Sequence, residues 1–322
     1  MEIGYHASHE QFPPSRLLTV AARAEEAGFQ AVLSSDHLAP WSRRQGESGL
    51  AWSWLGAVLA TTSLPTGVVT APGDRYHPVI VAQAIATLAE MFPGRLVPAL
   101  GSGQALNEHV TGRPWPPKAA RNRRLAECAS VIRRLLAGEE VTHEGLVTTR
   151  AARVWSLPAS PPPLFAAALS PATAHQVAAW ADGLITVNAP DEDLAAVVRA
   201  FREGGGEGRP VHVQAHLSWA PSPADAEAQA MDQWRANALP PILNEELALP
   251  EQVDAAVEHV PLAALRSSVW IETDPHWYVD RLASYAALGI DRVYLHQVGR
   301  DQERFVDTFG ERVLPLLQQR EL

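Results

Sequence analysis

Short apolar runs alternate along this chain with longer segments in which apolar residues recur every three or four positions. The first two runs, at residues 3–5 and 29–34, flank a segment over 15–27 whose apolar positions have helical spacing and which ends at Gly28. A strand, a helix and a second strand in this order predict two parallel strands joined by a right-handed crossover.

The same alternation continues to the C-terminal end of the sequence. We expect eight strands, at residues 3–5, 29–34, 65–70, 95–100, 164–169, 183–187, 210–219 and 292–296. Helical segments separate them, and the weaker pattern of residues 239–274 predicts a helical insertion over one end of the barrel. This pattern predicts an α/β fold, a (β/α)8 TIM barrel that forms one domain over residues 1–322. The alternative, a doubly wound sheet, normally has a Gly-x-Gly-x-x-Gly turn after its first strand, where this chain reads YHASH.

Composition and charge narrow the class of protein. Of 322 residues, 47% are hydrophobic and 19% are charged, which allows a sizeable core. The formal net charge of −10 argues against a nucleic-acid or anionic-membrane partner. A single cysteine, Cys128, excludes an intrachain disulfide and a cysteine zinc cluster. With no charged-then-apolar leader and no run of about 18 apolar residues, we expect a cytoplasmic protein that acts on a small molecule.

Polar side chains follow several predicted strands, and in a barrel the carboxyl ends of all strands share one mouth. The second strand ends in Ser35, Asp36 and His37, with Trp41 close behind. His37 is the best candidate for a general acid or base, because an imidazole with an ordinary pKa of about 6.5 exchanges protons near neutral pH. Its alternative role is that of a histidine hydrogen-bonded within a loop. Other polar candidates at the strand ends are His6, Thr70, Gln104, Asn107, Glu108, Asn188 and His296.

Two further patterns point to ligand binding. Ser170 and Thr173 place two hydroxyls on one face of a helix N-terminus, where free N–H groups and the helix dipole favour a phosphate. A plain N-cap at Ser170 is the alternative. The Gly101-Ser102-Gly103 turn would let the backbone approach a flat ligand closely, although Gly-x-Gly alone is a weak signal.

Metal binding is another alternative at the same strand ends. His6, His9, Asp36 and His37 could serve as ligands, which would indicate a metal-dependent barrel hydrolase. Such hydrolases usually begin with His-x-His on the first strand, whose alternate residues point the same way. His6 and His9 are three positions apart, so we expect no metal site.

Four ordered motifs resemble those of the bacterial luciferase-like flavin oxidoreductase superfamily. They are GYHASHEQF at residues 4–12, SDH at 35–37 followed by Pro40 and Trp41, RYHP at 75–78 followed by Ala82 and Gln83, and GSGQALNE at 101–108. The similarity covers most of residues 1–317. The branch that it resembles most is that of the deazaflavin (coenzyme F-420)-dependent glucose-6-phosphate dehydrogenases.

The resemblance implies a luciferase-like TIM barrel with an insertion and with a flavin or deazaflavin ring in its mouth. Asp36 and His37 match an acid–histidine pair beside the ring, with His37 as the proton acceptor from a substrate alcohol. Trp41 matches an indole near the substrate. The Gly67–Val68 peptide lies where the family often has a non-proline cis bond that supports the ring.

Roles for individual residues follow from these matches. Catalytic roles are expected for Asp36, His37, Trp41 and Gln104. Cofactor contacts are expected from Asp36, Gly67, Val68, Thr70, Gly101, Ser102, Gly103, Asn107, Ser170 and Thr173. Substrate contacts are expected from His6, Trp41, Glu108, Asn188 and His296.

Three departures from the dehydrogenase pattern shape the functional hypothesis. Gln104 replaces a glutamate, and an amide cannot donate an acid proton. Val187 and Pro190 replace the threonine and lysine of the sugar-phosphate site, so glucose 6-phosphate is not the expected substrate. Leu169 and Ser170 replace a Gly-Gly pair that lies along the deazaflavin tail, and the resulting Ser-x-x-Thr resembles the FMN-phosphate site of luciferase-like monooxygenases.

The leading hypothesis is therefore an FMN-dependent oxidoreductase or monooxygenase, which transfers hydride or activates oxygen at the flavin and acts on an unknown small organic substrate. The main alternative is a deazaflavin-dependent dehydrogenase or reductase that acts on an alcohol or aldehyde. A metal-dependent hydrolase and a non-catalytic flavin-binding protein are alternatives of other classes. The resemblance also suggests a homodimer and a separate flavin reductase as partners.

Overall fold

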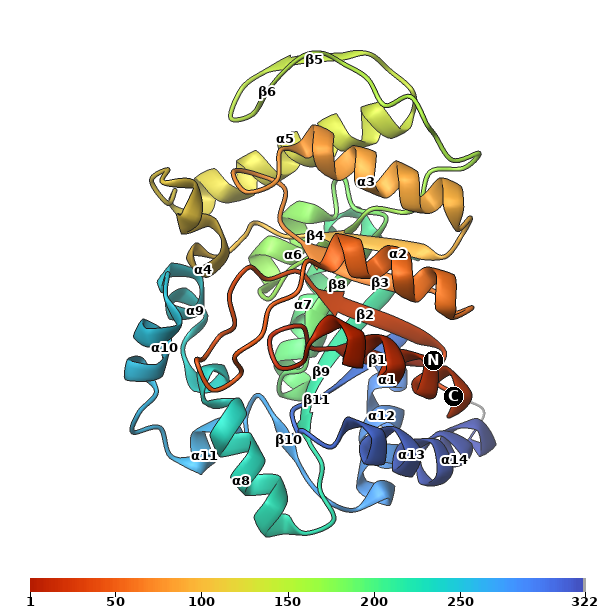
Figure 1. The fold of residues 1–322 in the computed structure, drawn as a ribbon, viewed down its shortest axis with the longest axis vertical. Coiled ribbons are helices and arrows are strands. Elements are labelled where there is room, and N and C mark those ends of the chain that lie inside the picture. The colour runs from red at the N-terminus through yellow and green to blue at the C-terminus, as the bar shows by residue number, and fades with distance from the viewer. Residues whose placement is uncertain (321–322) are drawn as a thin grey trace.

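The computed structural model describes residues 1–320, and its centre is a closed barrel of parallel strands (Figure 1). Around the barrel the strands follow the order β1, β2, β3, β4, β7, β8, β9 and β11, and β11 pairs again with β1. This architecture confirms the predicted (β/α)8 TIM barrel. The strand bounds are Glu2–Ala7 (β1), Ala31–Ser35 (β2), Thr66–Thr70 (β3), Leu96–Leu100 (β4), Phe165–Ala167 (β7), Gly183–Val187 (β8), Val211–Ser218 (β9) and Arg292–Gln297 (β11).

Helices between the strands form the outer layer of the barrel (Figure 1). None of the helices within residues 1–320 is long and apolar enough to cross a membrane. The helix bounds are Pro14–Glu26 (α1), Ala51–Thr61 (α2), Pro78–Met91 (α3), Ala105–Glu108 (α4), Lys118–Leu136 (α5), Pro171–Val177 (α6), Asp191–Phe201 (α7), Pro223–Gln233 (α8), Pro275–Ala287 (α12), Gln302–Arg312 (α13) and Leu314–Gln319 (α14).

Side chains alternate between the two faces of each barrel strand. Outward residues pack under the helices in two large apolar clusters, whereas inward residues fill the barrel. The inner cluster consists of Ala31, Leu33, Ala99, Phe165, Ile185 and Tyr294. Residues two positions further along each strand therefore line the mouth.

Two parts of the chain differ from the expected pattern. The helical segment after the last strand, which the sequence predicts as one helix over residues 304–319, is divided into α13 and α14, because Pro315 cannot donate the N–H that a continuous helix would need. α4 is a single helical turn that the sequence analysis did not expect. Residues 138–157, where the sequence favours irregular or short-hairpin structure, contain β5 (Val141–Glu144) and β6 (Thr148–Ala152), which form an antiparallel hairpin that projects beyond α5 in Figure 1.

Residues 239–274, the expected insertion, pack against loops that follow the barrel strands. Lys118 Nζ lies 2.6 Å from Glu245 Oε1, which joins this segment to the start of α5. Ser42 Oγ donates a hydrogen bond of 2.6 Å to Asp254, which joins it to the loop after β2. Its elements are α9 (Pro241–Glu246), α10 (Pro250–Ala256), α11 (Leu262–Leu265) and β10 (Trp270–Ile271), and β10 pairs with β9.

Candidate active site

The mouth of the barrel has two sides of different chemistry. The side formed by β3, β4 and β7, here called the small-residue side, carries Val69, Gly101 and Ala167 at its inward positions near the mouth, with Gly67 and Ala99 lower in the barrel. The side formed by β1, β9 and β11, here called the imidazole side, carries His6, Gln214, His216 and His296. The inward direction follows from strand alternation, since His296 lies two residues after Tyr294 of the inner cluster.

His37 lies at the end of β2 beside a buried carboxylate. Its Nε2 is 3.6 Å from Glu10 Oε1, and the Glu10 residue is only 3% exposed. The hydroxyls of Ser8 and Ser35 both donate to Glu10 Oε2, at 3.1 and 2.8 Å, and so hold the carboxylate in place. The Trp41 ring centroid lies 5.3 Å from that of His37. The structure thus brings His37 and Trp41 together and adds Glu10, which the sequence analysis missed.

The electrostatics of this pair favour a neutral imidazole beside an ionised carboxylate. Burial lowers the pKa of His37 below its ordinary value, and Glu10 only partly opposes this effect. Burial acts to raise the pKa of Glu10, but the nearby imidazoles, a backbone N–H and the Ser35 hydroxyl outweigh it and lower the pKa. Near neutral pH, His37 can therefore accept a proton, and Glu10 can stabilise the resulting imidazolium.

Asp36 has a different environment, because adjacent residues of an extended segment point apart. Thr70 Oγ1 donates to Asp36 Oδ2 at 2.6 Å, and the Tyr76 hydroxyl donates to Oδ1 at 3.3 Å. Arg75 Nη2 lies 3.3 Å from Asp36 Oδ2 and also donates to its backbone oxygen at 2.9 Å. The Arg75 backbone N–H donates to Glu108 Oε2 at 2.9 Å. Asp36 and Glu108 therefore flank Arg75, and neither is hydrogen-bonded to the His37 ring.

The turn after β4 forms an edge of the small-residue side. Gly103 has φ +83°, a left-handed conformation that glycine adopts without strain. A Cβ at this position would lie 3.4 Å from both Glu108 Cγ and Trp115 Cη2, so the turn is closely packed. Ser102 Oγ accepts a hydrogen bond of 3.2 Å from Lys118 Nζ.

Asn107 joins this turn to the loop that carries His37. Its Oδ1 accepts a hydrogen bond of 2.8 Å from the backbone N–H of Leu38, and its Nδ2 contacts Gln104 Oε1 at 3.4 Å. The structure therefore places Asn107 beside the residue that follows His37, with Gln104 next to Asn107. The Asn107 side chain is occupied in positioning the loop.

The Gly67–Val68 prediction needs correction in two respects. The peptide is trans, and residues 1–320 contain no cis bond, so the expected cis peptide is wrong. Both residues instead belong to a regular parallel ladder with β2 on one side and β4 on the other. The side chain of Val68 points outward into a helix-covered cluster, so only its backbone lies at the barrel wall. Gly67 faces inward, where a Cβ would be 2.8 Å from Leu33 Cδ1.

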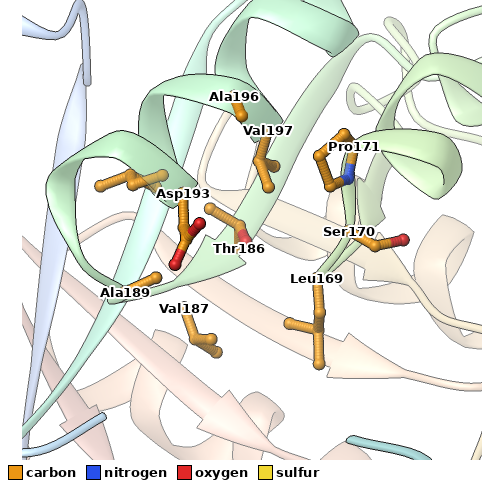
Figure 2. A pocket seen from close by; sticks show the side chains of 10 residues that line it. Leu169, Ser170, Pro171, Thr186, Val187, Ala189, Asp193, Ala196 and Val197 are labelled. Atoms are coloured by element: carbon orange, nitrogen blue, oxygen red, sulfur yellow. The ribbon is translucent and has the colours of Figure 1, made fainter. Parts of the chain in front are cut away.

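Ser170 begins α6 at the edge of a cavity of about 270 Å³ between the β7–α6 and β8–α7 units (Figure 2). Its hydroxyl accepts from Thr173 N at 3.4 Å and donates to Thr173 Oγ1 at 3.1 Å, which is the N-cap alternative. Asp193 contributes the only charged side chain among the residues that line the cavity, and a carboxylate disfavours a phosphate. The remaining lining residues are Leu169, Pro171, Thr186, Val187, Ala189, Leu194, Ala196 and Val197.

The remaining predicted substrate contacts separate into two groups. His6 and His296 stack in the mouth with ring centroids 3.8 Å apart. Asn188 is instead structural, because its Oδ1 accepts from His216 N at 2.8 Å and its Nδ2 donates to Ser268 O at 3.0 Å. The asparagine thus connects β8 to β9 and to the 239–274 segment.

The metal-site alternative receives no geometric support. Within residues 1–320, no group of three or more His, Cys, Asp or Glu side chains is arranged to hold a metal ion. His9 packs edge-on against Trp54, with ring centroids 4.9 Å apart. A metal-dependent hydrolase at these histidines is therefore not favoured.

This chain is similar to one protein family and to several proteins that share one name. The family model described as "Luciferase-like monooxygenase" matches residues 1–292. A protein of Nakamurella multipartita named F420-dependent glucose-6-phosphate dehydrogenase is 36% identical over 329 residues, which cover 99% of this chain and 97% of that protein. A protein of the same name from Microbacterium testaceum is 35% identical, with 99% of this chain and 98% of that protein covered.

A solved structure shows similarity at the level of the whole chain. It is described as an F420-dependent secondary alcohol dehydrogenase in complex with an F420-acetone adduct. The TM-score is 0.92 at 30% sequence identity, and the alignment covers 98% of both chains. The barrel, its loops and the late insertion therefore have a counterpart of nearly the same shape.

Proposed function

The chain belongs to the luciferase-like monooxygenase family, and from this premise we propose that it is a deazaflavin (coenzyme F420)-dependent oxidoreductase that interconverts a small alcohol and its carbonyl compound. The observation that carries the proposal is the His37–Glu10 pair, a buried neutral base with a carboxylate 3.6 Å away at the barrel mouth. Removal of an alcohol proton requires a base of this kind.

The choice of deazaflavin over FMN follows from the relatives and from the predicted phosphate seat. Relatives at 30–36% identity that span almost the entire chain are named for F420. The FMN prediction depended on Ser170 and Thr173, which cap α6 beside a cavity that contains Asp193. FMN and oxygen activation stay predictions without support from these contacts, and so does the need for a separate flavin reductase.

The small-residue side fits a flat ring. A Cβ on Gly101 would project to within 3.7 Å of the Ala167 Cβ, so the glycine leaves a shallow bed on the barrel wall. Trp115 lies at the edge of this bed against Gly103, and its buried Nε1 has no hydrogen-bond partner in the described structure. Gly101, Gly103 and Trp115 are therefore the residues that would hold the ring. When bound, the deazaflavin supplies a two-electron acceptor for a hydride.

The proton chemistry belongs to His37. Because Nε2 faces the Glu10 carboxylate, the favoured tautomer carries its proton on Nε2 and leaves Nδ1 as the acceptor. Nδ1 is buried and has no hydrogen-bond partner within the described residues. His37 Nδ1 therefore takes the hydroxyl proton as the carbonyl forms and the alcohol C–H leaves as hydride. Glu10 then pairs with the imidazolium, and Trp41 shields it on one side.

The proposal is tested by titrating the apo-protein separately with the deazaflavin coenzyme and with FMN. We expect deazaflavin binding in the micromolar range or tighter, weaker FMN binding, and reduction of the bound deazaflavin on addition of propan-2-ol. The reverse preference would restore the FMN hypothesis. Tight deazaflavin binding without reduction by any of a panel of alcohols would contradict the dehydrogenase activity.

A further inference from the structure

The imidazole side contains a stacked pair of buried histidines that proton abstraction does not use. His6 on β1 and His296 on β11 lie on neighbouring strands, with ring centroids 3.8 Å apart and planes inclined by 21°. They are 1% and 6% exposed. Both side chains point inward, at positions level with the barrel mouth on their strands.

Gln214 determines which nitrogen of His296 carries the proton. The Gln214 amide nitrogen lies 2.9 Å from His296 Nδ1 and 3.2 Å from His216 Nε2. An amide NH2 only donates, so both imidazole nitrogens must accept. His296 therefore carries its proton on Nε2, and that N–H has no partner within residues 1–320.

The His6 ring has fewer hydrogen-bond partners than the His296 ring. Neither its Nδ1 nor its Nε2 has a hydrogen-bond partner among the described residues. A neutral imidazole offers one donor and one acceptor. Together with the N–H of His296, the pair presents two donors and one acceptor, and unpaired buried groups of this kind are costly unless a ligand satisfies them.

The surrounding groups keep this pair uncharged. Burial lowers the pKa of His6 to about 3, although Glu10 opposes the shift, and the neighbouring imidazoles lower it further. Burial also lowers the pKa of His216 to about 3 and that of His296 far below its ordinary value. The Trp234 ring packs against this group, with its centroid 4.5 Å from that of His216 and 4.7 Å from that of His296. Within residues 1–320, no Lys or Arg side chain contributes a hydrogen bond to this group, so an anionic substrate group would find no counter-ion there.

We propose that His6 and His296 form a subsite for a second, uncharged oxygen of the substrate, in addition to the hydroxyl that His37 deprotonates. The proposal rests on the proposed function and specifies its substrate class as uncharged diols and the corresponding hydroxy ketones. The hydroxyl oxygen accepts a hydrogen bond from His296 Nε2–H, and the hydroxyl O–H donates a hydrogen bond to the free acceptor nitrogen of His6. A phosphate group is disfavoured at this subsite, since neutral imidazoles do not balance its charge.

The test compares acetone with hydroxyacetone, which differ by one hydroxyl, as ligands of the deazaflavin-loaded protein in calorimetric titrations. We expect hydroxyacetone to bind about tenfold more tightly, as one or two neutral hydrogen bonds would give. In His296→Leu and in His6→Leu, the ratio of hydroxyacetone affinity to acetone affinity should fall below about twofold, and the affinity for acetone should stay unchanged. His296→Gln, which keeps a donor, should restore part of it.

A matched control is His212→Leu. His212 is also buried, with a pKa of about 3, but it packs lower in the barrel between Phe165 and Tyr294. Replacing His212 should leave the preference for hydroxyacetone over acetone unchanged. Unfolding temperatures measured for each variant separate loss of the subsite from loss of the fold.

The outcomes distinguish the subsite from the proposed function. Equal affinity for the two ketones, or a preference that persists in both leucine variants, would overturn the subsite even if alcohols still reduce the coenzyme. A preference that depends on His6 and His296 without any hydride transfer would support the subsite and contradict the dehydrogenase. Binding of neither ketone would overturn both.

Discussion

The two sides of the mouth share the same strand geometry but present opposite surfaces. On the small-residue side, Gly101 and Ala167 leave room, so the wall is a bed for a flat group. On the imidazole side, His6 and His296 fill the space with polar edges that remain neutral. His37 lies between the two sides, in the loop just after β2. Under the proposed function, this difference would separate cofactor recognition from substrate recognition within one ring of strand ends.

The largest expected effect comes from removing the base between the two sides. His37→Ala should lower kcat by about 10²–10⁴, because the alcohol proton then has no acceptor. Deazaflavin affinity should change little, since the ring bed lies on β4 and β7. Stopped-flow reduction and fluorescence titration measure the two quantities. A comparable loss of coenzyme affinity would show that His37 belongs to the cofactor side instead.

The small-residue side is tested by filling its bed. Gly101→Leu places a side chain where the ring is proposed to lie, and we expect deazaflavin affinity to fall by about tenfold or more. Ketone binding in the absence of coenzyme should be affected less. Gly94→Ala is the control for a backbone disturbance away from this side, because Gly94 has φ +74° and no atom lies within 4 Å of an added Cβ. Unchanged coenzyme affinity in Gly101→Leu would remove the ring from this side.

Glu10→Gln tests whether the carboxylate positions and stabilises His37. We expect a rate loss of about tenfold and a shift in pH dependence. In the wild type, activity is lost as pH falls through the pKa of His37, which burial places below its ordinary value while Glu10 raises it. Without that contribution the pKa falls further, so the acid limb of the kcat profile should move to lower pH. A limb that moves upward or stays in place would contradict this coupling.

The smallest effect is expected at Ser170 and Thr173, outside both sides. Replacing both with alanine should lower the free energy of unfolding by about 1 kcal/mol, the value of an N-cap, and leave deazaflavin affinity unchanged. Chemical denaturation and coenzyme titration provide the comparison. A large loss of FMN affinity in the double variant would restore the predicted phosphate seat.

The sequence was sufficient for the parts of the fold that depend on local periodicity. The eight barrel strands follow from apolar runs bounded by helical segments, and only their ends differ by a few residues. The two-residue strand β10 and the single turn α4 were not predicted, because elements so short carry no period of their own. Pro315 predicts the division of the C-terminal helix, although the sequence analysis did not use this residue.

The same distinction applies to the site. The sequence by itself determined that His37, Trp41 and the Gly101–Gly103 turn lie at strand ends, because a strand end is a local property. Only the tertiary structure decided that Glu10 lies beside His37, that Gln214 sets the proton of His296, and that Ser170 caps a helix next to Asp193. These contacts join residues up to 82 positions apart and exist only once the barrel has closed. Burial, which makes these groups neutral or ionised, is a property of that closed barrel and of no single segment.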